Sequence, residues 1–530
     1  DELRDQMLPN DYCYEQDNYA RTSLRTWVNV VYGKMTNIDR KKKLVIVNNG
    51  TVVPYDHLII SVGLQYQIPA PTEADVSASV TNAELPNPPD RRYFKNPPKN
   101  LFLINDAYDA AVALYWIENY LLKSQRNIVI YGSSLDAYCC IQTLLTMGLT
   151  GDRIHLVQPP LTYQTTCLNN PVLDNTILKA LENSGVHVYN DHILAQWNDG
   201  ADDVSEISSV SFTTSKQPAR LECGAFFSYY KKAVDYEAFR AINDACLVYD
   251  GKLVIDAAFH TNDVTIRGAG TVTKFQRKYH ADQWTHANFN SKEVGVHLAT
   301  EMLRLFDPTM EPQPAPPEET LNLIPIYRNP KIQGGVLPGG YVYLHVAKPG
   351  LDMPLADQMA QHDYGKEYIT GTADGTPEFF RIHINQYNNV ETITCLSKSS
   401  IPASNLICLY GLHERCLNNL VSRYNEGLIK DFYMYFMETW CLAMYHDRFT
   451  DFRDEVRELL SNRPEEGIES VEEKVRQIID EDVPMNESQK EQLLKIYQAT
   501  GTKRAVDTRF LSFLSYNYYH LPMYAKPGMV

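Results

Sequence analysis

The sequence contains no apolar run of the ~20 residues that a bilayer-spanning helix needs, and no signal peptide opens it. It also lacks an excess of basic residues: 65 Asp and Glu outnumber 49 Lys and Arg, and the formal net charge is −16. That balance excludes the basic face on which nucleic-acid binding depends. We therefore expect a soluble protein of the cytoplasm with no membrane or nucleic-acid partner. At 530 residues the chain is long enough for about three domains of roughly 150 residues each.

The ten cysteines include no C-x-x-C pair, which excludes the usual zinc and thioredoxin-like signatures. Cys139 and Cys140 are neighbours on a predicted helix and point about 100° apart. We interpret the cysteines as small buried hydrophobes in a reducing compartment. Three histidines lie close together in the sequence (His280, His286 and His297), but no two of them have the i, i+4 helical spacing of a metal-binding pair. We interpret them as surface or core residues, and the sequence predicts no metal site.

A βαβ unit is the clearest architectural signal. An apolar run at Asn127–Tyr131 ends at Gly132, a helical pattern continues to Met147, and a second strand follows at Arg153–Val157. Other β-type runs lie at Trp27–Tyr32, Lys43–Val47, Leu58–Val62, Val186–Tyr189, Ile207–Thr213, Lys252–Ile255, Val264–Ile266, Gly340–Val346, Phe379–Asn385 and Glu391–Lys398. Helices are predicted at Asp106–Lys123, Asp174–Asn183 and Lys292–Phe306, and most of Glu414–Leu460 is predicted to be helical. Strands alternating with helices indicate an α/β protein with a parallel sheet.

The turn of the βαβ unit raises the question of dinucleotide binding. A Rossmann turn uses three glycines, so that the backbone bends tightly, approaches the pyrophosphate and packs helix on strand. Here the first is Gly132, the second position is Ser134 and the third is Ala137. A serine Cβ stands where a phosphate would approach, and the charge of Asp136 repels it. The next strand ends in the neutral Gln158 instead of an acid for the ribose, so we favour a structural βαβ over a nucleotide site.

Two further segments resemble motifs of the flavoprotein pyridine-nucleotide oxidoreductases. Residues 55–63, YDHLIISVG, are similar to that family's "YDxLIxATG" strand, and residues 261–271 are similar to its second flavin motif, "T…IxAxGD". The resemblance implies a Rossmann-like fold with two dinucleotide-binding domains and an α+β C-terminal domain. It also implies an aspartate contact to the flavin ribityl chain, but the aspartate is replaced by Thr271. The candidate cofactor contacts, all read as vestigial, are Gly63, Gly132, Ser134, Ala137, Gln158, Gly268, Gly270 and Thr271.

This resemblance and the composition predict the domain organisation. The family's first βαβ would precede the Leu24 region and has no counterpart in the sequence, so the first domain is expected to be partial. The predicted parts are a partial FAD-like domain (1–126), an NAD(P)-like Rossmann domain (127–250), a return to the FAD-like domain (251–307), a Pro-rich linker (308–320) and a C-terminal α+β interface domain with a helical tail (321–530).

The same segments, the degenerate turn at Gly132 and the long tail together resemble the C-terminal region of the cilia- and flagella-associated protein 61 family. That resemblance implies a non-catalytic scaffold in the axoneme of cilia and flagella, with protein partners in the calmodulin- and spoke-associated complex at radial spoke three. This hypothesis depends on the altered residues at 134, 158 and 271 and on the missing thiol pair, and it expects no cofactor. The alternative is an oxidoreductase or nucleotide sensor that binds FAD or NAD(P), and it depends on the four retained glycines.

Overall fold

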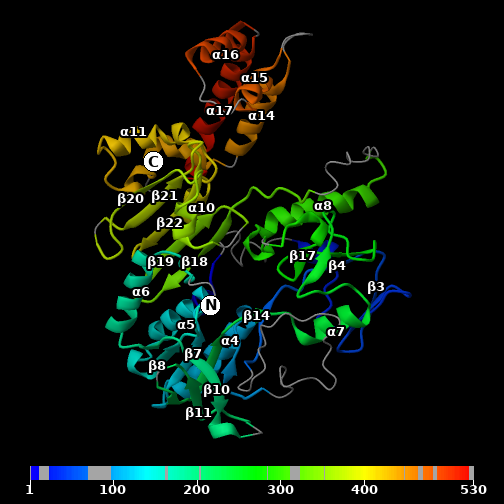
Figure 1. Cartoon of the computed structure of the whole chain (residues 1–530), viewed down its shortest axis with the longest axis vertical. Helices are drawn as coiled ribbons and strands as arrows, with labels where there is room; N and C mark the ends of the chain where they lie inside the picture. The colour runs from blue at the N-terminus through cyan, green and yellow to red at the C-terminus, as the bar shows by residue number, and fades with distance from the viewer. Residues whose placement is uncertain are drawn as a thin grey trace. The chain divides into compact units, whose positions relative to one another are not determined.

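The computed structural model describes residues 2–10, 23–69, 97–161, 165–201, 204–215, 217–282, 284–310, 323–350, 353–375, 377–446, 448–463, 469–480, 486–499 and 501–524. The chain forms two compact units, Asp1–Ala403 and Ser404–Val530 (Figure 1). Most of the predicted loop at 69–100 and of the predicted linker at 308–320 falls outside the described residues. The division at Ala403 falls inside the predicted C-terminal domain, 321–530, and the predicted domain boundaries stay a prediction.

A five-stranded parallel sheet forms the centre of the first unit, in the order β6-β13-β7-β8-β9. Its strands are β6 (Leu101–Phe102), β13 (Ala225–Tyr229), β7 (Ile128–Gly132), β8 (Ile154–Val157) and β9 (His187–Tyr189). Three helices belong to this part: α4 (Ala107–Trp116), α5 (Leu135–Thr146) and α6 (Pro171–Asn183). Every residue of β7, β8 and β13 is buried, because a parallel sheet is covered on both faces. The predicted βαβ unit is confirmed as β7-α5-β8.

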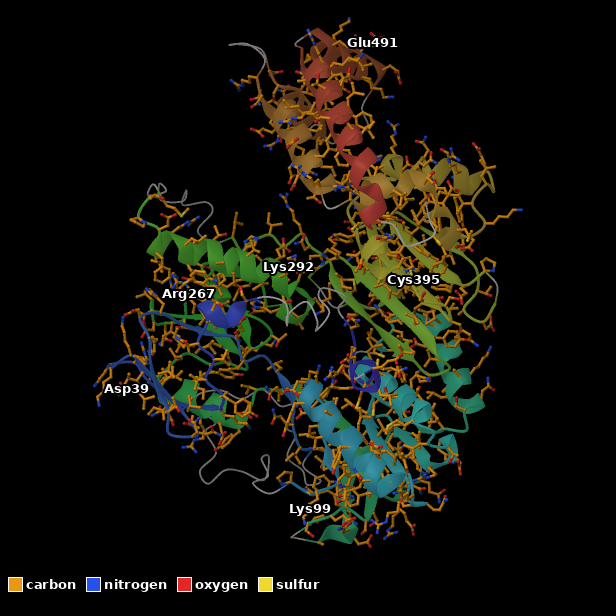
Figure 2. The ribbon with its side chains drawn as sticks, turned by 180° about the vertical axis from the view of Figure 1, so that it is seen from behind. Asp39, Lys99, Arg267, Lys292, Cys395 and Glu491 are labelled. Carbon is orange, nitrogen blue, oxygen red and sulfur yellow. The ribbon has the colours of Figure 1, made fainter. Side chains whose placement is uncertain are left out.

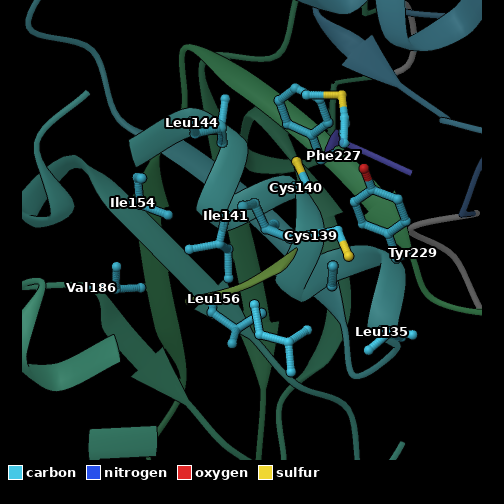
Figure 3. Packing of buried hydrophobic residues seen from close by; sticks show 14 of the residues in the cluster. Leu135, Cys139, Cys140, Ile141, Leu144, Ile154, Leu156, Val186, Phe227 and Tyr229 are labelled. Carbon is cyan, nitrogen blue, oxygen red and sulfur yellow. The ribbon is translucent and has the colours of Figure 1, made fainter. Parts of the chain in front are cut away.

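The main core lies between α5 and this sheet. Figure 3 shows Cys139, Cys140 and Leu144 of α5 packed close to Phe227 and Tyr229 of β13. Both cysteines are fully buried and carry free thiols, as the sequence predicts. The same prediction is wrong for Cys246, Cys408 and Cys416, which are exposed. Burial raises the pKa of the Cys140 thiol to about 12, so it stays protonated and unreactive.

The remainder of the first 310 residues consists of small sheets. Their strands are β1 (Met35–Asp39), β2 (Leu44–Val47), β3 (Val52–Pro54), β4 (Leu58–Ile60), β5 (Gln65–Tyr66), β10 (Ile193–Trp197), β11 (Ser209–Thr213), β12 (Ala219–Glu222), β14 (Lys232–Ala233), β15 (Leu253–Ile255), β16 (Ile266–Gly268) and β17 (Thr273–Phe275). Their helices are α1 (Glu2–Gln6), α3 (Leu24–Trp27), α7 (Tyr236–Asp244) and α8 (Ser291–Phe306). The parallel pair β16-β4 joins segments that are about 200 residues apart in the sequence. The parallel pair β15-β17 joins segments that are about 20 residues apart. Arg267, labelled in Figure 2, lies on β16.

The predicted strand at Trp27–Tyr32 is wrong. Residues 24–27 form α3, residues 28–32 have no regular structure, and the first strand is β1. Trp27 and Tyr32 are strongly exposed. Aromatic residues favour strands because they pack against side chains of a neighbouring strand, and these two residues are not buried against one.

An antiparallel sheet follows in the order β18-β19-β22-β21-β20. Its strands are β18 (Lys331–Leu337), β19 (Tyr341–Ala347), β20 (Lys366–Thr370), β21 (Phe379–Ile384) and β22 (Val390–Ser397), with helix α9 (Leu355–Met359) before β20. Figure 2 marks Cys395 on β22, in the middle of the sheet. The hairpin turn between β18 and β19 lies against α5, and the Gly340 N–H donates to Gln142 Oε1 at 3.2 Å.

The second unit is helical in the residues that the structure describes. The helices are α10 (Ala403–Ile407, which starts at the last residue of the first unit), α11 (Leu420–Asn425), α12 (Phe432–Tyr435), α13 (Leu442–Tyr445), α14 (Phe449–Ser461), α15 (Val471–Asp480), α16 (Glu487–Ala499) and α17 (Thr502–Tyr524). Phe452 of α14 stacks on Phe513 of α17, with ring centroids 4.7 Å apart. The predicted helical content of Glu414–Leu460 is confirmed, although it is divided into short helices.

Candidate dinucleotide site

The first candidate site is the N-terminal end of α5, at the carboxyl edge of the parallel sheet. The backbone N–H groups in the first turn of a helix have no partner within the helix, so a helix N-terminus attracts anions. Ser134 is the N-cap of α5, and its Oγ accepts a hydrogen bond from the Ala137 N–H at 3.4 Å. The helix end is therefore capped by its own side chain. The structure brings Gly132, Ser134, Ala137 and Gln158 to this edge, as the βαβ pattern predicts.

Tyr66 of β5 closes the same end of the helix. Its hydroxyl group donates to Ser134 Oγ at 3.1 Å and to Asp136 Oδ2 at 2.9 Å, sharing one proton between two acceptors. The Tyr66 side chain is 4% exposed, and its ring meets that of Tyr229 edge-on with centroids 5.3 Å apart. Burial, and then the charge of Asp136, raise the pKa of Tyr66 well above its ordinary value, so the hydroxyl remains a donor. A tyrosine hydroxyl therefore occupies the first turn of α5.

The electrostatics of this end are also satisfied internally. Lys232 of β14 places Nζ 3.7 Å from Asp136 Oδ1 and 4.7 Å from the centre of the Tyr66 ring. Strands β5 and β14 pair directly, with Lys232 opposite Tyr66. The negative charge that a helix N-terminus favours is thus supplied by Asp136, and its countercharge by Lys232. We call Tyr66, Ser134, Asp136 and Lys232 the polar plug.

Gln158 stands at the position where the resemblance places the ribose-binding acid. Its Nε2 donates to the Tyr138 hydroxyl at 3.2 Å, and its backbone N–H donates to the Tyr189 carbonyl at 2.8 Å. Both groups are therefore used to join β8 to α5 and β9. Gln158 is held as a structural residue in this arrangement.

Gly132 is required by a neighbouring strand. An added Cβ would lie 2.3 Å from the Tyr229 carbonyl oxygen of β13, and the φ of Gly132 is +145°. Such a contact is far below the van der Waals distance, so no other residue fits without separating the two strands. The first glycine of the Rossmann pattern is explained by strand packing alone.

The second candidate site brings together the turns that follow β4 and β16. The Ala269 N–H donates to the Ile60 carbonyl at 3.0 Å, which sets the two turns side by side. Thr271 Oγ1 accepts a hydrogen bond from the Leu64 N–H at 3.0 Å. The residue that replaces the family's aspartate therefore joins the turn after β16 to the turn after β4. Gly270, with φ +81°, has nothing within 4 Å of an added Cβ.

The second site also contains Gly268, which packing explains. A Cβ there would lie 2.8 Å from Leu253 Cδ2 and 3.0 Å from Thr273 Cγ2. The structure thus collects all eight candidate residues at two sites, four at each. At the end of α5 the Ala137 N–H already donates to Ser134 Oγ, and the residues of the polar plug contact one another around it. At the second site, Gly270 leaves open space beside the backbone.

Sequence reasoning did not identify Tyr66 and Lys232. Tyr66 lies 68 residues from Ser134 and 70 from Asp136, so no local pattern links the three. The one available signal is the position of Tyr66 three residues after the turn at Gly63. That position predicts that Tyr66 lies in a strand, but it does not predict the contacts of Tyr66 with Ser134 and Asp136.

The Tyr66 hydroxyl should contribute measurably to stability. Replacing Tyr66 with Phe removes two hydrogen bonds, one of them to a carboxylate, and leaves Ser134 Oγ and Asp136 without their buried donor. We expect the free energy of unfolding to fall by about 1–3 kcal/mol. Urea denaturation followed by tryptophan fluorescence would measure it. Tyr108→Phe, at an exposed tyrosine of α4, should change the same quantity by less than about 0.5 kcal/mol.

The clustered histidines have separate structural roles. His286 is buried, with Nδ1 2.7 Å from Thr273 Oγ1, and the His297 ring packs on that of Tyr327. His280 ends a short 3-10 helix in the left-handed conformation. Among the described residues, no group of three or more His, Cys, Asp or Glu side chains is arranged to hold a metal ion.

His286 should make the protein acid-sensitive. Burial, and then the charge of Lys252, lower the pKa of His286 to about 4, against an unfolded value of 6.5. The unfolded chain therefore binds a proton first as the pH falls, so stability is complete above pH 6.5 and declines toward pH 4. The loss should reach about 3 kcal/mol. His286→Gln, compared with the exposed-site variant His362→Gln, should flatten this slope in urea unfolding measured from pH 7 to pH 4. An unchanged slope in His286→Gln would contradict the assignment.

The arrangement of these parts defines the class of protein. A parallel five-stranded sheet, a second part built on β4 and β16, and an antiparallel sheet after it make up the two-dinucleotide-domain reductase fold. Over 81% of its length the chain is similar to an NAD-dependent persulfide reductase from A. fulgidus, with 11% identity, 76% coverage of that chain and a TM-score of 0.50. A ferredoxin reductase from Rhodopseudomonas palustris matches with 12% identity, 79% and 85% coverage, and a TM-score of 0.48. The predicted α/β fold class is confirmed.

A more specific relationship lies in the sequence. Residues 325–444 match the CFAP61 dimerisation domain family. Over 647 aligned residues the chain is 21% identical to cilia- and flagella-associated protein 61 of Tetrahymena thermophila, with 99% of this chain covered. The chain spans 37% of the length of that relative. The predicted resemblance to the cilia- and flagella-associated protein 61 family is confirmed. The structure also describes no helix that is long and apolar enough to cross a membrane.

Proposed function

We propose that this chain is a non-catalytic scaffold of the cilium or flagellum, built on a reductase fold that no longer holds a dinucleotide. The polar plug at the N-terminus of α5 is the observation that carries the proposal. The buried Tyr66 hydroxyl donates to Ser134 and Asp136, and the exposed Lys232 lies 3.7 Å from the Asp136 carboxylate. A phosphate at this helix end would have to overcome the charge of Asp136 and compete with these hydrogen bonds.

The name of the relative supports a location in the cilium or flagellum. The protein of Tetrahymena thermophila is named as cilia- and flagella-associated, and residues 325–444 match a dimerisation domain. We place this chain in the axoneme, in the calmodulin- and spoke-associated complex at the base of radial spoke three, as part of a dimer. The antiparallel sheet β18–β22, which lies within the matched range, would belong to the subunit contact.

Cofactor content is the first test of this role. The purified chain should be colourless after gel filtration, with no flavin band in its visible spectrum. Titration with NADH should leave its tryptophan fluorescence unchanged beyond the inner-filter correction. A stoichiometric flavin band, or saturable quenching by NADH, would contradict the scaffold hypothesis. Electron tomography of axonemes would test the location. A tag fused to the chain should add density at the base of radial spoke three.

A second function has one observation in its favour. Gly270 keeps a left-handed backbone with open space beyond it, in the segment similar to a flavin motif. A flavin could contact that backbone even though Thr271 now bonds to Leu64. If a flavin band is found, Gly270→Val should remove it while Gly148→Val, at another open left-handed glycine, should leave it in place.

A further inference from the structure

Helix α4 presents a row of aromatic side chains to solvent. Tyr108, Val112, Tyr115 and Tyr120 are 70%, 46%, 69% and 63% exposed, and we call these four residues the tyrosine stripe. The opposite face of α4 is buried through Ala110 and Ala113, which lie in the main core. The stripe is therefore the outer face of a helix that is fixed in place by its inner face.

The local geometry of the chain aligns the first three residues of the stripe. Tyr108, Val112 and Tyr115 have i, i+4, i+7 spacing and share one face of an α-helix. Tyr120 lies five residues beyond Tyr115, which in an ideal α-helix would turn it roughly 140° away. The chain changes to a π-helical turn at Ile117–Leu121, where the Leu122 N–H donates to the Ile117 carbonyl at 3.1 Å. The wider π-turn changes this rotation, and the Tyr120 ring lies beside that of Trp116, with centroids 5.5 Å apart.

The charge of this segment has one sign. Between Asn105 and Leu122 there are three carboxylates, Asp106, Asp109 and Glu118, and no lysine or arginine. Exposed tyrosine rings attract guanidinium groups over their faces, and arginine also pairs with carboxylates in a fixed planar geometry. Aromatic side chains that stand exposed in a row are typical of protein interfaces, where tyrosine and arginine dominate the binding energy.

We propose that the tyrosine stripe is a docking site for an arginine-bearing amphipathic helix of a protein partner. A second copy of this chain fits less well, because it would bring the same three carboxylates against their equivalents. The stripe also lies outside residues 325–444, the range that matches a dimerisation domain. This inference rests on the proposed scaffold role, but its test measures peptide binding and not cofactor content, so the two can fail separately.

The test uses two synthetic helical peptides and the whole chain. Both peptides carry leucines at i, i+3, i+4, i+7 spacing; one has arginines on the flanks of that face and the other has glutamates. Fluorescence anisotropy at low ionic strength should show the arginine peptide binding at least tenfold more tightly than the glutamate peptide. The double variant Tyr108→Ser, Tyr115→Ser should weaken this binding tenfold or more. Glu118→Gln should weaken it severalfold and reduce its dependence on salt.

Tyr387→Ser is the matched control, because Tyr387 is 65% exposed in the turn between β21 and β22. It should leave peptide binding unchanged. Equal binding of the two peptides, no binding of either, or full affinity in the double variant would overturn the proposal. Sedimentation that shows a dimer in the parent chain and a monomer in the double variant would assign the stripe to a second copy instead, and would also overturn it.

Discussion

Replacing Gly132 with alanine should destabilise the first unit by about 4 kcal/mol. The added methyl group would stand 2.3 Å from the Tyr229 carbonyl oxygen and 2.6 Å from its carbon, so β7 and β13 would have to separate. A backbone φ of +145° adds strain for any residue with a side chain. Overpacking and backbone strain each cost about 1–3 kcal/mol. The loss should appear as a lower urea midpoint of the fluorescence transition.

Gly148→Ala is the matched control for this prediction. Gly148 has φ +95° but nothing within 4 Å of an added Cβ, so only the conformational cost of about 1 kcal/mol remains. A similar loss in both variants would show that the close approach of β13 is not what requires glycine at position 132. A tolerated Gly132→Ala would also reopen the interpretation that this glycine is kept for a cofactor.

The second large effect is expected in the antiparallel sheet. Arg381 of β21 is buried, and its Nη2 lies 2.6 Å from Glu367 Oε1 and 2.9 Å from the Tyr364 hydroxyl. Burial acts to raise the pKa of Glu367, but the hydrogen bond and charge of Arg381 outweigh it and hold that pKa below its ordinary value. Arg381→Ala leaves the half-buried Glu367 carboxylate without its charged partner and with only the Tyr364 hydroxyl as donor, which should cost about 3 kcal/mol in the free energy of unfolding.

An exposed pair with equally good geometry provides the comparison. Arg220 Nε and Nη2 each lie 2.9 Å from a carboxylate oxygen of Asp199, and both side chains are exposed. Arg220→Ala should leave the free energy of unfolding nearly unchanged, because solvent screens the pair. The double variant Arg381→Met, Glu367→Gln should recover much of the loss seen in Arg381→Ala. If it does not, the loss comes from packing of the arginine stem and not from the uncompensated charge.

The retained glycines are weak support for a cofactor once the structure is considered. Gly132 and Gly268 each face an atom closer than 3 Å to an added Cβ, and both atoms belong to the protein itself. Gly63 and Gly270 have positive φ in turns, which favours glycine with or without a ligand. A protein that loses its cofactor can therefore keep the glycines of the motif, because the fold still requires them.

Local patterns predicted elements well where a strand or helix could be recognised from its own residues. The β7-α5-β8 unit was predicted because four apolar residues, a glycine turn and an apolar helical face follow one another directly. The strand prediction at Trp27–Tyr32 was wrong because a strand also needs a neighbour. The π-turn at Ile117–Leu121 was not predicted, since no residue type in this segment distinguishes a π-turn from an α-helix.

The sequence by itself determined the fold class, the βαβ unit, the resemblance to the cilia- and flagella-associated protein 61 family and the absence of a C-x-x-C pair. These depend on composition and on local motifs, each of which spans no more than about 30 residues. Only the tertiary structure decided what fills the end of α5, because Tyr66 and Lys232 reach Ser134 and Asp136 from distant strands. A pattern along the chain shows which groups are available. Which of them meet is set by the pairing of β5 with β14 and by the burial that makes each unsatisfied polar group costly.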